Sequence, residues 1–363
     1  MKSKKILFLN PYPENAAPSQ RLKFEQYYPH LRAAGWQVDT SAFISRAFWK
    51  IIYQPGRLPA KAWYTLLGYC TRVGDLLAIR KYDVVYIHLW ATPLGPPIFE
   101  WLFCKLAKKV IYDIDDLVYL GDVKSKAHPI VNWLKGRKKP IFLMKHADHV
   151  VTCTPYLDKF VRQFNQQTTD ISSTIDTDRY RPKASYAFQE KPVIGWSGSH
   201  STSKYLHLLD DVLQELSHEI PFKLLVMGDP HFSIPGVDVE AIAWHDSYEV
   251  DTIRRFDIGL YPLPNEEWVL GKSGLKALQY MALGVPTIAT AIGTIHRIIE
   301  NGENGFLVNT PAEWKKAMAE LLGDESLREK LGSNSAQTVE ERYSINVTQH
   351  TYLRILNGVV GEN

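Results

Sequence analysis

The stretch RPKASYAFQEKPVIGWSG, residues 181–198, divides the sequence into two similar halves. Its first part is polar and bounded by prolines, which is typical of a linker, and its last part, PVIGWSG, begins a second series of short apolar runs. Short apolar runs that alternate with helical patterns indicate a parallel sheet covered by helices on both faces. The sequence therefore predicts two successive doubly wound α/β domains, joined by a linker near 181–192.

The expected strands follow the apolar runs. They lie at 4–10, 36–43, 83–89, 109–115 and 149–155 in the first half, and at 192–198, 222–228, 238–244, 257–263 and 286–290 in the second. Helical patterns occupy 20–34, 61–79, 96–107, 133–145 and 203–219. Ligands of such sheets bind at the carboxyl ends of the strands, so the loops there are candidates for chemistry and the cleft between two domains is the expected site.

Composition favours a globular protein of the cytoplasm. The chain has 363 residues, more than one hydrophobic core usually supports, with 45% hydrophobic and 22% charged residues. No apolar run approaches the roughly 20 residues that span a bilayer. Three widely spaced cysteines predict neither a disulfide framework nor a metal-ligand pair, so we expect a reducing compartment and no metal.

The charge is unevenly distributed along the chain. Residues 1–180 carry 26 Lys and Arg against 15 Asp and Glu, whereas the remainder carries 16 against 24. Within the basic half, RAFWKIIYQPGRLPAKAWYTLLGY at 46–69 interleaves cations with aromatic and aliphatic residues, which suits contact with an anionic membrane at its inner, cytoplasmic face. Ordinary helix packing is the alternative explanation. No feature indicates nucleic acid as the partner.

The loop after the first strand, NPYPENAAPSQR at 10–21, lacks the glycines of a dinucleotide-binding turn, and no P-loop motif occurs in the sequence. Both a dinucleotide oxidoreductase and a P-loop nucleotidase are therefore disfavoured. Ser19 is a candidate N-cap of the next helix, which would place Gln20 and Arg21 at its start, facing the cleft on the acceptor side.

Candidate catalytic residues follow the third and fourth strands. Asp113, Asp115 and Asp116 stand within four residues, and such carboxylates require cations, hydrogen bonds or a raised pKa. Capping a helix is the simpler role for Asp116, and a divalent metal is weakly indicated without a third, distant ligand. His88 is a further candidate, although a lone histidine is more often part of the core.

The second half contains two candidate phosphate-binding loops. In GWSGSHSTSKYL at 195–206, Gly198 ends a strand, Ser199 supplies a hydroxyl, and Lys204 is expected in the first turn of a helix. In GKSGLKALQYMALGVPT at 271–287, a helix beginning near Ser273 would align three polar side chains on one face, with apolar residues turned toward the sheet. These two loops supply the predicted donor-binding residues Gly198, Ser199, Lys204, Lys272, Ser273, Gly274, Lys276 and Gln279.

The second loop continues as KALQYMALGVPTIATAIGTIHRIIENGENGFLV at 276–308. This segment resembles the E-A-M-A-x-G-x-P-V signature, and its extension to G-x-N-G-x-L-V, of the family-4-like glycosyltransferases with the GT-B fold. The resemblance extends through IGWSGSHSTSKYL, YDIDD and ADHVVTCTPYL to most of the chain.

The resemblance implies retaining transfer of a sugar from a nucleotide-diphosphate donor to a glycan or lipid-linked acceptor, as in the synthesis of cell-surface polysaccharide or glycolipid. It implies a donor domain at 190–345 and an acceptor domain at 1–185, completed by about 346–363 from a final helix that crosses back. The nucleotide sugar is then a substrate, and no cofactor is required.

Two departures from the family pattern concern charge. Where relatives carry two glutamates on the donor helix, this sequence has Gly271 and Gln279, and where they carry an arginine before the lysine of the first donor loop it has Ser199. We therefore hypothesise that Lys272 and Lys276 bind the diphosphate. A GT-B epimerase or hydrolase and a non-catalytic sugar-binding scaffold remain alternatives.

Overall fold

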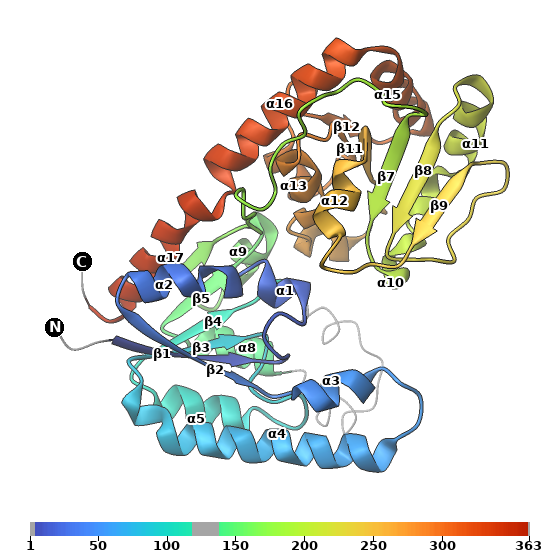
Figure 1. Ribbon diagram of the computed structural model, residues 1–363. Helices are drawn as coiled ribbons and strands as arrows, with labels where there is room; N and C mark the ends of the chain where they lie inside the picture. The colour runs from blue at the N-terminus through green and yellow to red at the C-terminus, as the bar shows by residue number, and fades with distance from the viewer. Residues whose placement is uncertain (1–3, 118–137, 362–363) are drawn as a thin grey trace. The chain divides into compact units, whose positions relative to one another are not determined.

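The computed structural model describes residues 4–117 and 138–361. The chain divides into two compact units, one formed by residues 1–172 with 348–363 and the other by residues 173–347 (Figure 1). The last residues of the chain therefore return to the first unit. The polar stretch at 181–192 packs on the second unit, where the backbone N–H of Lys183 donates to the carbonyl of Leu283 (2.9 Å).

The first unit contains a six-stranded parallel sheet in the order β2-β1-β3-β4-β5-β6. Its strands are β1 Lys4–Asn10, β2 Trp36–Ala42, β3 Val84–His88, β4 Val110–Asp113, β5 His149–Thr152 and β6 Thr168–Asp170. The helices are α1 Pro18–Arg21, α2 Tyr28–Ala33, α3 Arg46–Ile52, α4 Leu58–Ala78, α5 Ile98–Leu106, α8 Lys139–His146, α9 Pro155–Val161 and most of α17 Ile345–Val359.

Alternate residues of the strands build the two halves of this core. Leu7 and Val85 pack with Phe103 of α5 on one face of the sheet, the face that α4 and α5 cover (Figure 1). On the other face, the ring of Phe8 lies 4.8 Å from that of Tyr28 at the start of α2. This period of two is what a strand buried on both sides requires.

The second unit contains a six-stranded parallel sheet in the order β12-β11-β10-β7-β8-β9. Its strands are β7 Val193–Ser197, β8 Lys223–Met227, β9 Val239–Ile242, β10 Ile258–Tyr261, β11 Thr287–Thr290 and β12 Phe306–Val308. The helices are α10 His200–Ser203, α11 Asp210–Glu219, α12 Glu249–Arg254, α13 Leu275–Ala282, α14 Ile295–Ile298, α15 Pro311–Gly323 and α16 Glu325–Arg342.

The predicted fold class is confirmed, since each unit is a doubly wound α/β structure and every predicted strand is present. Two strands, β6 and β12, are additional to the prediction. The predicted helices at 20–34 and 203–219 are each broken into shorter segments. The first residues of the helix predicted at 133–145 lie outside the described part of the chain.

Candidate functional site

The strand order of the second sheet identifies one position as the expected ligand site. β7 and β10 are neighbours in the centre of the sheet, and from them the chain winds outward in opposite directions. In open α/β sheets ligands bind in the crevice outside the carboxyl ends of the strands at such a switch point. Trp196 near the end of β7 and Tyr261 at the end of β10 both border this position.

Lys276 of α13 extends its ammonium group to this point. Its Nζ lies 4.4 Å from the ring centroid of Trp196 and 5.9 Å from that of Tyr261, and it donates a long hydrogen bond (3.4 Å) to Oγ1 of Thr202. No carboxylate in the described part of the chain forms an ion pair with it. Burial, with a smaller contribution from Lys272, lowers the pKa of Lys276 to about 7. The site thus contains a desolvated cation without an anionic partner, which is costly unless an anion binds there.

Two glycines give the ammonium group its space. A methyl group on Gly198 would lie 2.6 Å from Nζ of Lys276, and one on Gly228, whose φ is +112°, would lie 2.0 Å from the carbonyl oxygen of Gly198. The loops after β7 and β8 are also joined by a hydrogen bond from the N–H of Gly198 to the carbonyl of Met227 (2.9 Å). Gly198 is therefore required where its loop approaches Lys276, and Gly228 is required where the loop after β8 approaches Gly198.

The loop after β7 presents a group of hydroxyls beside Lys276. Oγ of Ser199 lies 2.9 Å from Oγ of Ser201, and the N–H of Ser199 donates to Oγ1 of Thr202 (3.1 Å) in a capping box. The helix predicted to place Lys204 in its first turn is not formed, because α10 is a single turn and Lys204 is its C-cap residue. That part of the prediction is wrong, since Lys204 follows the turn of α10 instead of beginning a helix.

An exposed histidine is oriented at the same end of the sheet. Nδ1 of His200 lies 3.1 Å from Oδ2 of Asp229, which also accepts a hydrogen bond from Ser203 (2.6 Å). The bond from Ser203, then those from His200 and the backbone N–H of His231, lower the pKa of Asp229. The sequence analysis did not identify His200 or Asp229, although both follow predicted strands.

The segment before α13 holds the other predicted donor residues. Gly274, with φ of +76°, is the N-cap, so the helix begins at Leu275 rather than near Ser273. Ser273 lies with its Oγ 2.5 Å from that of Ser173, and Nζ of Lys272 lies over the ring of Trp268 at 5.5 Å. Lys272 and Lys276 are therefore in different surroundings, and only Lys276 reaches the switch point by a contact with Trp196.

Gln279 is buried within the second unit. Its Nε2 donates to the hydroxyl of Tyr180 (2.9 Å) and, more weakly, to Oε1 of Glu249 (3.4 Å). Tyr180 in turn donates to Oε2 of Glu249 (2.9 Å), and Nε1 of Trp244 donates to Oε1 (2.8 Å). Relatives carry a glutamate where this chain has Gln279. Here a carboxylate, that of Glu249 on α12, lies next to this position. Sequence offered no signal for this, because Glu249 and Tyr180 are distant in the chain.

In the first unit, Asp113 and His88 lie together in the core. Both side chains are fully buried, Asp113 forms an ion pair with the buried Lys23, and Nδ1 of His88 lies 3.3 Å from Oδ2 of Asp113. Burial alone would raise the pKa of Asp113, but the charge of Lys23 and the hydrogen bond from His88 hold it below its ordinary value. Lys23, which the sequence analysis did not single out, also donates to the carbonyl of Ile114 (3.0 Å).

The other two aspartates are partly accessible. Burial raises the pKa of Asp115, and the negative charges of Asp113 and Asp116 raise it further. His88 and Lys23 act in the opposite direction but do not cancel this increase. Oδ1 of Asp116 accepts from the N–H of Leu117 (2.8 Å). A carboxyl with a raised pKa at the carboxyl end of β4 is suited to hydrogen bonding with a hydroxyl group.

The acceptor-side residues lie on α1, which differs from the prediction. The N-cap is Ala17 with no side-chain hydrogen bond, so Ser19 is not the cap. Gln20 is fully buried, with its amide bonded to both the backbone of Tyr12 and the carboxylate of Glu25. Arg21 is partly exposed at the end of the helix.

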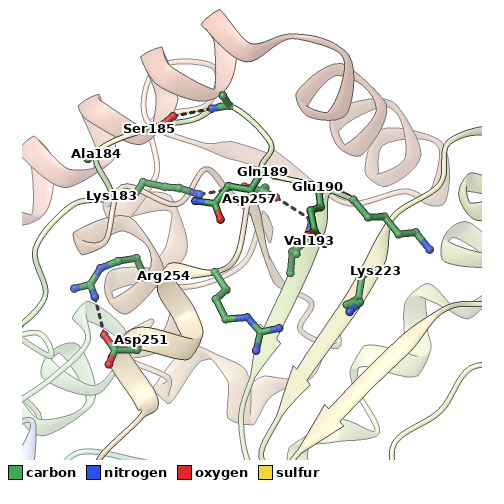
Figure 2. Close-up of a pocket in the computed structure, with 13 residues that line it drawn as sticks. Lys183, Ala184, Ser185, Gln189, Glu190, Val193, Lys223, Asp251, Arg254 and Asp257 are labelled. Atoms are coloured by element: carbon green, nitrogen blue, oxygen red, sulfur yellow. Dashed lines mark hydrogen bonds and ion pairs between the residues drawn. The ribbon is translucent and has the colours of Figure 1, made fainter.

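The described residues contain no group of three His, Cys, Asp or Glu side chains that could hold a metal ion. The second unit does contain a hollow of about 780 Å³, shown in Figure 2. It lies at the amino ends of β7 and β8, where Val193 and Lys223 begin these strands, and therefore at the edge of the sheet opposite to Lys276. Its cations are paired, as by Lys183 with Asp257 (3.2 Å) and Arg254 with Asp251 (2.7 Å). Neither its position nor its charge suits a donor site.

Comparison with known proteins finds relatives of part of the chain. Residues 191–324 match the family described as Glycosyl transferases group 1. A D-inositol 3-phosphate glycosyltransferase of Paenarthrobacter aurescens is 32% identical over 112 residues, 30% of this chain and 26% of the relative. The capsular polysaccharide biosynthesis glycosyltransferase CapM of Staphylococcus aureus is 29% identical over 187 residues, 47% of each chain. The chain thus spans a quarter to a half of the length of these relatives.

Solved structures resemble the whole chain. A sucrose-phosphate synthase of Thermosynechococcus elongatus aligns with a TM-score of 0.69 at 18% identity, over 98% of both chains. HepE of Anabaena, solved in complex with UDP-glucose, aligns with a TM-score of 0.69 at 15% identity, over 98% of this chain and 99% of its own. Residues 191–324 therefore match the group 1 glycosyltransferase family, and the chain as a whole shares the GT-B fold of the solved structures. The predicted family resemblance is confirmed.

The region that matches the group 1 family includes both candidate donor loops, from Gly198 to Gln279, together with the switch point. This region ends before α16 and includes no residue of the first unit. For the first unit, the solved structures therefore support the fold but not the roles of individual residues. The assignment of catalytic, donor and acceptor roles to individual side chains accordingly remains a prediction.

Proposed function

We propose that the protein is a glycosyltransferase that moves a sugar from a nucleoside-diphosphate donor, bound by the group 1 domain, to an acceptor bound by the first unit. The acceptor in this proposal is a glycan or a lipid-linked precursor of cell-surface polysaccharide or glycolipid. Configuration at the sugar carbon is retained. HepE, a structural neighbour, was solved with a nucleotide sugar, which supports the donor class.

The observation that carries the proposal is the ammonium group of Lys276 at the switch point, which has no carboxylate partner among the described residues. A diphosphate at the carboxyl ends of β7 and β10 would meet this cation and the hydroxyls of Ser199 and Thr202. It would thereby supply an anionic partner, which this half-buried lysine lacks within the described part of the chain. Lys272 is the second candidate cation, from the segment before the same helix.

The chemistry assigned to these groups is electrostatic. When the bond between sugar and diphosphate breaks, negative charge accumulates on the departing phosphate oxygens and positive character develops on the sugar carbon. Lys276 would stabilise the first charge because its position is fixed before the reaction begins. In the first unit, Asp115 is the candidate for orienting the acceptor hydroxyl, because its carboxyl is both accessible and shifted in pKa.

Replacing Lys276 by Met tests the donor assignment. The substitution keeps the length of the side chain but removes the charge, so we expect affinity for the donor to fall about ten- to a hundredfold. Binding is measured by calorimetry, using the UDP- or GDP-sugar that raises the melting temperature of the unaltered protein. Lys316→Met, on the exposed side of α15, is the matched control and is expected to bind normally. Unchanged donor affinity in Lys276→Met would remove this lysine from the site.

Turnover separates the proposed transferase from its alternatives. A scaffold would bind the donor without consuming it, and a hydrolase would release free sugar at a rate independent of any added acceptor. For a transferase, donor consumption depends on the acceptor, and the anomeric configuration of the product, measured by NMR, reports retention or inversion. Inversion would contradict the retaining mechanism while leaving the donor assignment intact.

A further inference from the structure

The outer surface of α4 is unusual for a surface helix because it carries no charge. This helix of 21 residues exposes eleven of them, and Thr71 is the only one with a polar side chain. Its hydroxyl donates to the carbonyl of Leu67 (3.1 Å) within the helix. The exposed residues are Leu58, Pro59, Ala62, Trp63, Leu66, Leu67, Cys70, Thr71, Val73, Gly74 and Leu77. Helices that face water normally place charged residues on that side.

The charged residues of α4 are directed elsewhere. Arg72 is fully buried and pairs with Asp75 (2.8 Å), and Nζ of Lys61 donates to the carbonyl of Gln54 before the helix (2.6 Å). The large apolar side chains remain outside, with Leu77 exposed by 86% and Trp63 by 58%. The helix therefore has the reverse of the usual arrangement, because its ion pair faces the interior of the unit and its large apolar residues face outward.

The neighbouring helix extends this apolar surface. Tyr69 of α4 donates to the carbonyl of Leu94 (2.9 Å) and its ring lies 5.6 Å from that of Phe99, which joins α4 to α5 on one side of the sheet (Figure 1). On and before α5, Leu94, Ile98 and Trp101 are each about half exposed. We call the exposed residues of α4 together with Leu94, Ile98, Trp101 and Leu106 the α4–α5 face.

Cations flank this face, and carboxylates are withdrawn from it. Residues 46–109 contain three acidic side chains, which pair with Arg72, Lys108 and Lys139. In contrast, six exposed cations at the ends of α3, α4 and α5 form no ion pair with a described residue. They are Arg46, Lys50, Arg57, Arg80, Lys81 and Lys105. An apolar strip with tryptophans and a cationic border is complementary to the interface of a bilayer with anionic headgroups.

We propose that the α4–α5 face docks on an anionic membrane, with α4 lying in the plane of the interface. No helix within the described ranges is long and apolar enough to cross a bilayer. The surface differs from the one predicted at 46–69, because Phe48 is buried and the exposed apolar residues continue instead to Leu77 and α5. This inference rests on the proposed function. It adds to it by favouring a lipid-linked acceptor over a soluble glycan.

Vesicle co-sedimentation tests the proposal. We expect the full chain to bind vesicles of phosphatidylcholine with phosphatidylglycerol and to bind pure phosphatidylcholine weakly. Leu66→Glu combined with Leu77→Glu should lower partitioning at least about tenfold. Lys50→Glu should lower it about fivefold, with the effect lost in high salt. The matched control is Leu208→Glu, which alters a side chain exposed by 56% in the second unit and should bind normally.

Three results would overturn the proposal. The first is that the protein does not bind anionic vesicles, and the second is that the double variant binds them as well as the unaltered protein does. The third is that the protein does not bind vesicles but forms a dimer, detected by sedimentation velocity, which the double variant cannot form. Calorimetry with the nucleotide sugar on the same preparations separates the two proposals. Vesicle binding without donor binding would contradict the proposed function alone, and donor binding without vesicle binding would contradict the docking face alone.

Discussion

A single lysine links the stability of the second unit to its proposed chemistry. Lys276 is held against Trp196 with no carboxylate partner in the described chain, and its pKa is lowered to about 7. An anionic diphosphate would restore the pKa toward its ordinary value, so donor binding should be accompanied by proton uptake near neutral pH. Under the proposed function, the cation is unfavourable in the free protein and becomes favourable when the diphosphate binds.

Donor affinity should accordingly depend on pH. Because the amine of Lys276 loses its charge as pH rises above about 7, we expect affinity to fall by up to about tenfold per pH unit in that range. Calorimetry in buffers of different ionisation enthalpy measures both the affinity and the proton uptake. The dependence should be absent in Lys276→Met. A constant affinity across the range in the unaltered protein would show that the charge of this lysine is not used.

The same shift predicts the effect of the substitution on stability. The folded-state pKa lies below the unfolded value, so the unfolded chain holds the proton more tightly and stability decreases as pH falls from about 10 toward 7. Lys276→Met removes this cost, and we expect its melting temperature at pH 7 to rise by about 2 °C or more. A lower melting temperature would indicate that the ammonium group contributes favourable contacts.

At the level of elements, Arg72 explains how α4 can present an apolar outer surface. From inside the first unit its guanidinium donates to the carbonyls of Ala91 (2.7 Å) and Asn10 (2.9 Å) as well as to Asp75. A single side chain thus joins α4 to the ends of β1 and β3. The helix is attached by polar contacts on its inner side, which leaves its apolar residues free for another surface.

Arg72→Met should therefore destabilise the first unit. The change leaves Asp75 without its partner and several carbonyls unsatisfied, and we expect a loss of about 3–5 kcal/mol in the free energy of unfolding. Urea denaturation followed by tryptophan fluorescence measures it. Arg80→Met, at the exposed end of the same region, is the control and should change stability by less than about 0.5 kcal/mol. A similar effect of both substitutions would argue against the anchoring role.

The elements also show what the sequence could predict. The apolar runs located ten strands because a buried parallel strand requires such a run, whereas β6, with the sequence TTD, is polar and only three residues long. The helix predicted at 203–219 is broken where hydroxyls bond to backbone carbonyls, as Ser203 does to His200 (2.9 Å), since this competes with the helical pattern. At the site, spacing predicted Lys276 on a helix with Lys272 just before its start, and both positions are confirmed. It could not reveal that Lys276 would lie over Trp196 from another strand while Lys272 lies over Trp268, or that Lys23 would neutralise Asp113.

At the level of the whole molecule, the first unit depends on the last helix of the described chain. The ring of Tyr352 in α17 lies 4.4 Å from that of Tyr27, and its hydroxyl donates to the carbonyl of Lys23 (3.3 Å). Ile355 and Leu356 are also buried. Residues separated by more than three hundred positions thus complete one core.

Tyr352→Ala should loosen the first unit selectively. We expect a loss of about 3–5 kcal/mol in its unfolding free energy, because a large buried side chain is removed. Hydrogen exchange followed peptide by peptide should show faster exchange in β1 and β3 and little change in β7 and β8. Tyr248→Ala, at a side chain exposed by 37%, is the control. Equal loosening of both units would mean that α17 does not act mainly on the first.

The return of α17 has a consequence for biosynthesis. The second unit is an insertion between two parts of the first, so a nascent chain that has produced β1 to β6 must still add some 175 residues before α17 is made. At typical translation rates this takes roughly 10–35 s. During that interval the second unit can already fold, while Tyr27 and its neighbours lack their covering helix. The order of folding on the ribosome is therefore expected to be the reverse of the order of the units in the sequence, and the waiting first unit is the part most in need of a chaperone.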